Sequence, residues 1–177
     1  MFPKVTLVLG GASSGKSAFA ENLVKTRSGQ HVYIASAQAF DDEMAAKIDR
    51  HRAQRSSEWN TIEVPFDVTA QLAKFSVGEV VLFDCATLWL SNHLIADHDV
   101  SAEQDALISA LVSCDAHVVV VSNEVGHGVV PEHTLSRRFR DAQGKLNQKI
   151  AQSADLVVTV IAGLPLVLKG ELPEGAA

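Results

Sequence analysis

Short apolar runs alternate along the chain with longer segments of helical spacing. Four runs have the length and β-branched content of buried parallel strands: Val5 to Leu9, His31 to Ala35, Val80 to Phe83 and His117 to Ser122. A fifth strand is expected at Leu156 to Ile161. Helical periodicity predicts helices over Ser17 to Lys25, Asp42 to Arg55, Ala102 to Val112 and Leu135 to Ser153. This alternation predicts an α/β fold with a mostly parallel central sheet and helices on both faces.

The loops that follow the predicted strands are rich in glycine or polar residues. In open α/β sheets, ligands bind outside the carboxyl ends of the strands. We therefore expect the chemistry of this protein in four loops: Gly10 to Ser17, Ser36 to Asp42, Asp84 to Thr87 and Asn123 to Pro131.

Size and charge narrow the choice of class. A chain of 177 residues that is 47% hydrophobic fits one compact domain. We assign residues 1–170 to that domain and residues 171–177 to a frayed C-terminal tail. The formal net charge of -6 argues against a general nucleic-acid or anionic-membrane surface, because phosphate backbones bind to basic faces. Any phosphate site must therefore be local.

The sequence shows no membrane segment and no disulfide framework. No apolar stretch is long enough to cross a bilayer and the first residues lack a signal-peptide pattern, so we expect a cytoplasmic protein. Cys85 and Cys114 each lie beside an apolar run, and we expect both to be reduced core residues. The apolar stretch Leu88-Trp89-Leu90 suits either the core or an interface between subunits.

A phosphate-binding pattern lies between the first predicted strand and the first predicted helix. It reads Gly10-Gly11-Ala12-Ser13-Ser14-Gly15-Lys16-Ser17 and matches G-x-x-x-x-G-K-[ST]. Its backbone N–H groups can converge on phosphate oxygens, Lys16 can reach the β and γ phosphates, and Ser17 can ligate Mg²⁺. The match favours a single-domain P-loop NTPase-like fold; the alternative is a glycine-rich turn that binds nothing.

Asp84 ends the apolar run that begins at Val80, as a magnesium-binding Walker-B aspartate does. Taken alone, Asp84 could equally be a helix cap or a turn residue. Even with both motifs, the pattern does not choose between hydrolysis, phosphoryl transfer and nucleotidyl transfer, because all three use the same loop and metal.

A histidine among cations lies on the predicted helix Asp42 to Arg55. Lys47, His51 and Arg55 recur at i, i+4 spacing and so share one face, with Arg52 beside them. Nearby cations favour the neutral, nucleophilic imidazole and can bind the phosphates of a nucleotide. His51 could therefore attack an α-phosphate and carry a nucleotide, although a basic helix end is also typical of a solvated surface.

Together these motifs resemble the bifunctional adenosylcobinamide kinase and adenosylcobinamide-phosphate guanylyltransferase family of cobalamin biosynthesis. The resemblance runs through almost the whole chain. Its residues are Gly10 to Ser17, Tyr33 to Ala35, Asp41 to Met44, His51, Arg52, Arg55, Trp59, Thr61, Glu63, Asp84, Thr87 to Trp89, Asn92, Ser122 to Gly126, Val129 to Pro131, Phe139 to Asp141, Gly144, and Leu146 to Gln148.

The resemblance implies two reactions. ATP or GTP phosphorylates the aminopropanol arm of adenosylcobinamide, and GMP from GTP is then transferred onto that phosphate with release of pyrophosphate. In the family a histidine carries the GMP, and the motif places this role on His51. The family also tends to form homo-oligomers. The positions that match nucleotide contacts are Ser36, Ala37, Gln38, Arg52, Ala53, Gln54, Arg55, Glu63 and Asp84.

Two positions depart from the family pattern. Ser13 stands where arginine is usual, and Ser36 stands where threonine is common. Serine retains the hydroxyl at position 36, whereas Ser13 removes a possible charge near the phosphates and leaves the backbone of the loop intact.

Two other functions account for part of this pattern. A small-molecule P-loop kinase without a covalent intermediate would use Lys16, Ser17 and Asp84 but not His51. A nucleotide-dependent regulatory protein would bind without group transfer. The remaining histidines show no convincing metal-ligand spacing, although His127, in the loop Asn123 to Pro131, could touch substrate, and neighbouring Glu124 is the better candidate for a polar contact.

Overall fold

The computed structural model describes residues 2–38 and 59–176 of the chain. The predicted helix Asp42 to Arg55 lies outside the described residues. The same holds for His51, Arg52, Ala53, Gln54 and Arg55.

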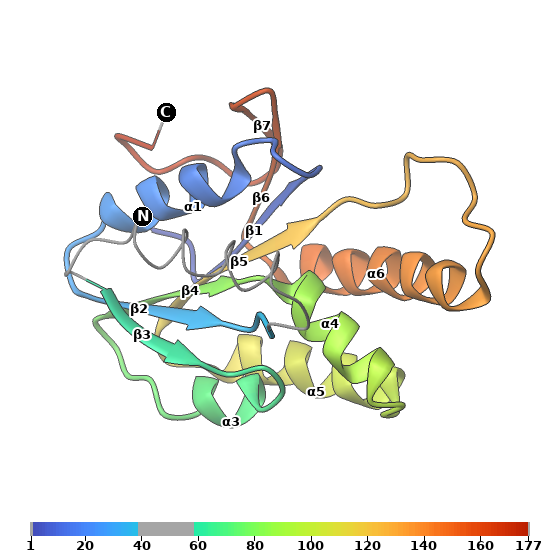
Figure 1. Cartoon of the computed structure of the whole chain (residues 1–177). Coiled ribbons are helices and arrows are strands. Elements are labelled where there is room, and N and C mark those ends of the chain that lie inside the picture. The colour runs from blue at the N-terminus through green and yellow to red at the C-terminus, as the bar shows by residue number, and fades with distance from the viewer. Residues whose placement is uncertain (1, 39–58, 177) are drawn as a thin grey trace.

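A twisted sheet forms the centre of the molecule (Figure 1). Within the described residues its strand order is β3-β2-β4-β5-β1-β6-β7. The strands are β1 (Val5–Gly10), β2 (Gln30–Ala35), β3 (Trp59–Glu63), β4 (Glu79–Asp84), β5 (His117–Asn123), β6 (Leu156–Ile161) and β7 (Leu164–Lys169). All neighbouring strands pair in parallel except β6 and β7, which are antiparallel. The predicted α/β fold with a mostly parallel sheet is therefore confirmed.

The five predicted strands are confirmed to within one residue at each end. They are buried on both faces, which explains their continuous apolar runs. The edge strands β3 and β7 were not predicted. β3 carries polar residues such as Asn60 and Thr61, while β7 contains Pro165 and is largely exposed. A two-residue turn with positive φ at Ala162 and Gly163 joins β6 to β7, as in type I′ hairpin turns, whose twist matches that of the flanking strands.

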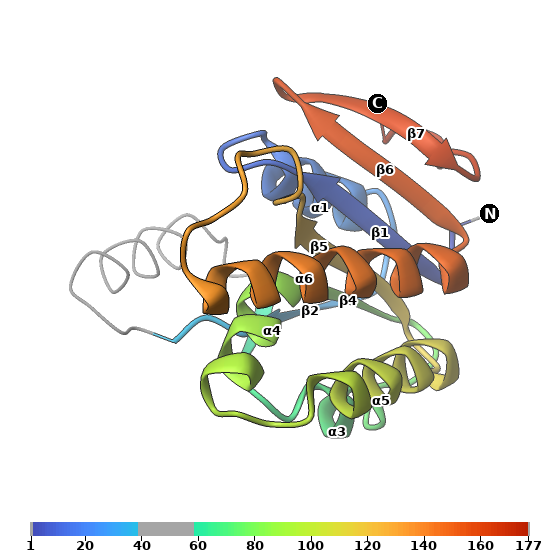
Figure 2. The same ribbon diagram turned by 90° about the vertical axis from the view of Figure 1, so that its right-hand side faces the viewer.

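Helices cover both faces of this sheet, as predicted (Figures 1 and 2). One face carries α1 (Lys16–Lys25). The other carries α3 (Val68–Leu72), α4 (Ala86–Ile95), α5 (Val100–Ser113) and α6 (Thr134–Ser153). None of the helices in the described ranges has the length and apolarity that a membrane span needs.

Each face has its own apolar core, because successive strand residues point to opposite sides. Leu7 packs with Trp89 and Leu111 in the core under α3 to α6, while its neighbour Val8 packs with Leu23 under α1. Trp89 and Leu90 are fully buried, so core packing explains this part of the apolar stretch.

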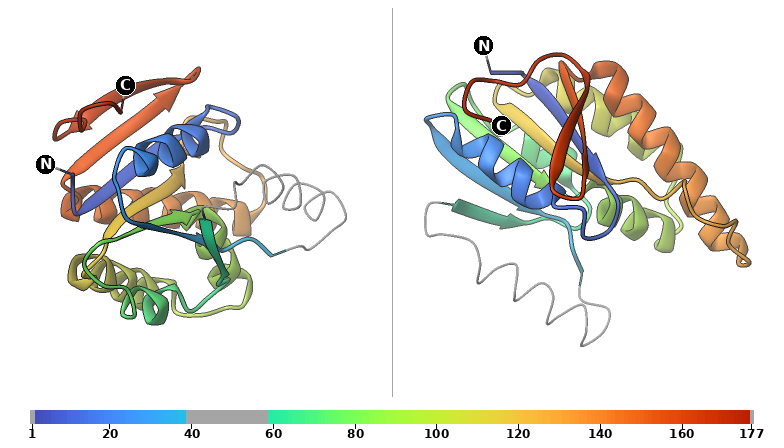
Figure 3. Two further views of the ribbon diagram at one scale, coloured as in Figure 1. Left: turned by 90° about the vertical axis from the view of Figure 1, so that its left-hand side faces the viewer. Right: turned by 90° about the horizontal axis from the view of Figure 1, so that it is seen from above.

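The C-terminal segment runs beside α1 (Figure 3). Leu172 and Ala176, from the residues predicted to fray, pack against the core on this face.

A buried polar cluster joins α6 to the carboxyl end of β5. The Ser122 hydroxyl donates to Asn147 Oδ1 at 2.6 Å, and the Gln143 amide donates to both, at 2.9 and 3.0 Å. Asn147 Nδ2 in turn donates to the Asn123 carbonyl at 3.1 Å. These bonds fix where the loop after β5 begins.

Replacing Asn147 by alanine should lower the free energy of unfolding by about 2 to 4 kcal/mol. The substitution removes one partner from each of three buried polar groups, which then lack their hydrogen bonds. Urea titration followed by circular dichroism measures the change. Gln148→Ala on the exposed side of the same helix is the control and should shift stability by about 0.5 kcal/mol or less. Equal effects of the two substitutions would contradict the structural role of the cluster.

Candidate nucleotide-binding site

The loop between β1 and α1 has the closed shape of a phosphate loop. Ser14 N donates to the Gly11 carbonyl at 3.3 Å, and Gly15 precedes α1 with a left-handed φ of 92°. Only glycine fits at position 10, because other atoms lie close to its Cα. A Cβ there would lie 2.8 Å from the carbonyl oxygen of Val160 and would collide with the Ser14 hydroxyl. The predicted strand-to-helix setting of the motif is confirmed.

Lys16 and Ser17 form the first turn of α1 behind this loop. The Lys16 ammonium donates to the Gly11 carbonyl at 3.0 Å, which holds its charge against the loop. Ser13 has a left-handed φ of 57°, an uncommon conformation for a residue with a side chain. Gly11, Ala12 and Ser13 are exposed, so this stretch of the loop faces solvent.

The turn between β6 and β7 supports the phosphate loop from outside. Gly163 N donates to the Ser14 carbonyl at 2.8 Å. This support comes from a hairpin that the sequence did not predict.

Asp84 is the last residue of β4, and Cys85, not Asp84, occupies the N-cap position of α4. The Tyr33 hydroxyl donates to Asp84 Oδ2 at 2.9 Å and so orients the carboxylate. The helix-cap alternative for Asp84 is therefore excluded. The strand-end position expected of a Walker-B aspartate is confirmed.

Parallel pairing brings the other strand ends to the same edge. Glu63, Ala35 and Asp84 lie level across β3, β2 and β4, while Gly10 and Asn123 lie level across β1 and β5. Four strand steps of about 4.8 Å separate β3 from β1, so Glu63 lies roughly 19 Å from the phosphate loop.

Ser36 is fully buried and links two strand ends. Its hydroxyl donates to the Cys85 carbonyl at 2.7 Å and accepts from Cys85 N at 3.1 Å, while Asn92 donates to the Ser36 carbonyl at 2.9 Å. These partners are structural. Contact of Ser36 with a nucleotide stays a prediction, as it does for the half-buried Ala37 and Gln38 that follow.

The loop Asn123 to Pro131 is held against the phosphate loop. Glu124 N donates to the Gly10 carbonyl at 3.0 Å, and Asn123 N donates to the Thr87 hydroxyl at 2.7 Å. Further along, Arg140 of α6 donates to the Gly126 carbonyl. The Glu124 carboxylate accepts from Gly126 N, so its contact is within the loop itself. His127 is exposed, and its contact with substrate stays a prediction.

The comparisons with known proteins agree on the family. The model of the cobinamide kinase / cobinamide phosphate guanyltransferase family (CobU) matches residues 6–168. The bifunctional adenosylcobalamin biosynthesis protein CobP of Pseudomonas aeruginosa is 45% identical, covering 93% of this chain and 97% of that protein. CobU of Escherichia coli is 41% identical, covering 92% and 98%. This chain belongs to the CobU family.

Solved structures with little sequence similarity share the fold. A Pyrococcus horikoshii protein has a TM-score of 0.53 at 7% identity, covering 98% of this chain and 89% of its own. An ATPase of a bacterial type III secretion system has a TM-score of 0.54 at 7% identity, covering 93% and 56%. At 7% identity these two structures are evidence for the fold only. Homo-oligomerisation, which resemblance to the CobU family implies, stays a prediction for this chain.

Sequence reasoning missed several residues that shape the site of this CobU-family chain. Tyr33, Thr87 and Asn147 belong to stretches that carry the family resemblance, but the sequence assigned them no role. Their partners lie 51, 36 and 24 positions away along the chain, so only the paired strands reveal the contacts.

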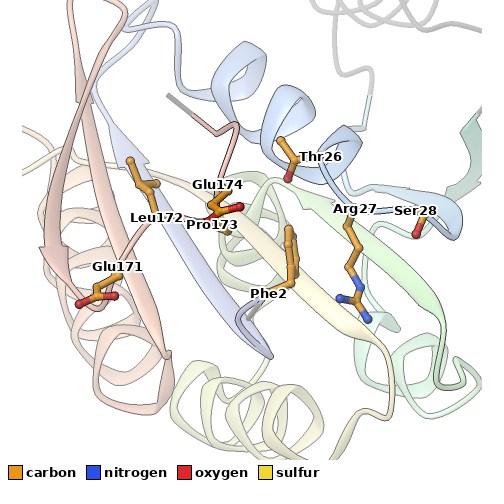
Figure 4. A pocket seen from close by; sticks show the side chains of 8 residues that line it. All are labelled: Phe2, Thr26, Arg27, Ser28, Glu171, Leu172, Pro173 and Glu174. Carbon is orange, nitrogen blue, oxygen red and sulfur yellow. The ribbon is translucent and has the colours of Figure 1, made fainter.

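A cleft of about 630 Å³ lies at the far end of α1 from the phosphate loop (Figure 4). Thr26, Arg27 and Ser28 line it, together with Phe2 and residues 171–174. The Arg27 guanidinium lies 5.5 Å from the centre of the Phe2 ring. Among the described residues, those predicted for nucleotide binding do not line this cleft.

Cys85 lies next to the candidate metal ligand and is a neutral thiol. Burial, with the adjacent Asp84 charge, raises its pKa to about 12, against the opposing effects of the Leu88 and Thr87 N–H groups and Lys16. Burial also raises the pKa of Cys114, and both thiols are free, as predicted.

Neither cysteine should react with 5,5′-dithiobis(2-nitrobenzoate) in the native protein at pH 8. A thiol with a pKa of about 12 holds only about a thousandth of the thiolate of an ordinary thiol. Release of the thiolate chromophore measures the reaction. In guanidinium chloride the same sample should release two equivalents, one for each cysteine of the chain. A native thiol that reacts as fast as free cysteine would contradict the buried position of Cys85 or Cys114.

Proposed function

We propose that this chain phosphorylates adenosylcobinamide with ATP or GTP and then transfers GMP from GTP onto the new phosphate. The observation that carries the proposal is the built phosphate loop after β1, with Asp84 at the end of β4 at the same edge of the sheet, in a chain of the CobU family. The loop supplies a triphosphate site, and the family supplies the pair of reactions.

In both reactions the phosphate loop binds the triphosphate of the nucleotide. Its exposed backbone and the positive end of α1 attract phosphate oxygens, and the Lys16 ammonium offsets their charge. Glu63, roughly 19 Å from the loop, is assigned with Ser36, Ala37 and Gln38 to the ribose and base end of the nucleotide.

Ser17 and Asp84 fit a magnesium ion by the chemistry of their donor atoms. A hydroxyl and a carboxylate oxygen are the hard donors that Mg²⁺ prefers, and bound Mg²⁺ neutralises charge on the phosphates. Tyr33 engages Asp84 Oδ2 and holds the carboxylate in one orientation, which leaves Oδ1 as the oxygen assigned to the ion.

In the kinase step, the substrate hydroxyl oxygen bonds to the γ-phosphorus while the bond from that phosphorus to the bridging oxygen breaks. The nucleoside diphosphate leaves and the hydroxyl loses its proton. Positioning and charge stabilisation carry most of this reaction, so it needs no protein nucleophile.

In the guanylyl step, an imidazole nitrogen of His51 bonds to the α-phosphorus of GTP and pyrophosphate leaves. A phosphate oxygen of the phosphorylated substrate then bonds to the same phosphorus, and the histidine nitrogen leaves. The product is adenosylcobinamide-GDP. Arg52, Ala53, Gln54 and Arg55 are assigned to nucleotide contacts beside His51, with the two arginines offsetting phosphate charge.

Lys16→Ala should reduce both activities by about a hundredfold or more and weaken triphosphate binding. Both reactions place phosphate charge on this loop, and one positioned donor is worth that much. Steady-state rates and equilibrium binding of GTP measure the loss. Lys25→Ala, at the exposed end of the same helix, is the matched control and should retain both activities. Full activity in Lys16→Ala would remove the phosphate loop from the mechanism.

His51→Ala should lose the covalent GMP adduct and lower guanylyl transfer by about a thousandfold or more, while kinase activity partly survives. GTP labelled at the α-phosphate measures the adduct, which should be cleaved by acid and stable to mild base as a phosphoramidate. Kinase turnover in the same preparation is the internal control for folding. Label that persists in the variant would assign the nucleophile elsewhere. A wild-type protein that takes up no label and transfers no GMP would favour the alternative, a small-molecule kinase.

A further inference from the structure

A cluster of two histidines and a glutamate lies at the corner where α4 ends and α5 begins, a corner visible in Figure 2. We name His93, His98 and Glu103 the corner cluster. One ligand atom from each residue lies within 4.8 Å of those of the other two. Their sequence spacing, H-x₄-H-x₄-E, is not a usual zinc pattern, so the fold rather than the spacing brings them together.

The end of α4 folds His98 back over His93. Asp97 has a left-handed φ of 56° and its N–H donates to the Leu94 carbonyl, while His98 N donates to the His93 carbonyl at 3.0 Å. This pair of bonds is a Schellman motif, in which the side chains of the first and sixth residues come into contact. Here both of those residues are histidines, and their Nδ1 atoms lie 3.0 Å apart.

The start of α5 then supplies the carboxylate. The Asp99 side chain caps α5 by accepting from Ser101 N and Ala102 N, which fixes the first turn of the helix. Glu103 projects from that turn, and its Oε2 lies 3.8 Å from His93 Nδ1. The corner is therefore built by two helix-end motifs in succession.

The spacing of the ligand atoms suits a tetrahedral ion. Zinc bonds of about 2.0 to 2.1 Å place neighbouring tetrahedral ligand atoms about 3.3 to 3.4 Å apart. Two separations in the corner cluster, 3.0 Å between the Nδ1 atoms and 3.8 Å from His93 Nδ1 to Glu103 Oε2, lie on either side of that value, and all three ligand atoms lie within 4.8 Å of one another. His98 and Glu103 are more exposed than His93, so these are the two side chains that can rotate to equalise the separations.

His93 also has the second partner that metal-binding histidines usually have. Its Nε2 lies 3.4 Å from the Phe66 carbonyl, a contact that places the ring proton on Nε2 and leaves the Nδ1 lone pair toward the cluster. The rings of Trp89 and Phe66, at 4.6 and 5.3 Å between centres, hold this orientation. Burial lowers the pKa of His93, which favours the neutral form that binds metals.

We propose that His93 Nδ1, His98 Nδ1 and the Glu103 carboxylate bind one divalent transition-metal ion, with zinc as the best match. Two imidazole nitrogens and one carboxylate oxygen favour Zn²⁺ or Co²⁺ over Mg²⁺, which takes oxygen ligands. Three protein ligands leave the fourth position to water. The Glu103 carboxylate, with Oε2 3.8 Å from His93 Nδ1, places a negative charge where the cation would lie.

The ion has a structural role because it ties the end of α4 to the start of α5. The other parts of α4 support the nucleotide site: Thr87 accepts from Asn123 N, and Asn92 donates to the Ser36 carbonyl. The corner cluster is separate from the magnesium position assigned to Ser17 and Asp84, and neither reaction proceeds through it.

The test is titration of the chelator-treated full chain with Co²⁺ in the presence of excess Mg²⁺, followed by visible absorbance. The expected result is one equivalent of cobalt with the intense bands of a tetrahedral site, displaced by Zn²⁺, and a rise in Tm on adding Zn²⁺. His98→Ala and Glu103→Gln should each weaken binding at least tenfold and abolish the zinc-dependent rise in Tm. Both side chains are more exposed than His93, so these variants keep the core intact.

His133→Ala, which removes an exposed histidine at the start of α6, is the matched control and should bind as the wild type does. Two results would overturn the proposal. One is a wild-type chain that takes up no cobalt or zinc, which would leave the cluster as a hydrogen-bonded pair of histidines beside a glutamate. The other is unchanged affinity in His98→Ala, which would place the ion elsewhere in the chain.

Discussion

The alignment of the parallel strands is the constraint on which the rest of this structure depends. Backbone pairing sets Gly10 level with Asn123, and sets Glu63, Ala35 and Asp84 level with one another. Because the pairing is parallel, each of these positions ends its strand at the same edge. Segments far apart along the chain thereby meet at one edge of the sheet.

Strand pairing does not fix the conformations of the loops beyond that edge. Hydrogen bonds from buried polar side chains fix them. Ser36 joins the ends of β2 and β4, Thr87 joins α4 to the end of β5, and Asn147 joins α6 to the same strand end. Inside a protein such bonds are costly to leave unmade, so they select one loop arrangement over others. The positions of the loops at this edge therefore depend on hydrogen bonds made by buried side chains.

The sequence predicts those parts of the fold that depend on local pattern. Continuous apolar runs identified the strands buried on both faces, and the glycine and lysine spacing identified the phosphate loop because its geometry is local. The edge strand β3 lacks such a run. β7 contains Pro165, and a proline inside an apolar run argues against a strand, so β7 was not predicted. The hydrogen bond from Tyr33 to Asp84 and the meeting of His93 with Glu103 depend on tertiary placement, for which residue spacing gives no signal.

The hairpin of β6 and β7 connects the phosphate loop to a much later part of the chain. Gly163 holds the carbonyl of Ser14, and Val160 limits the space beside Gly10. During synthesis, a chain that has reached only β5 already contains every residue of the phosphate loop. It still lacks Val160 and Gly163, which contact the loop. Part of the support of the phosphate loop is therefore synthesised long after the loop itself, so a product that ends before the β6–β7 hairpin would lack these contacts.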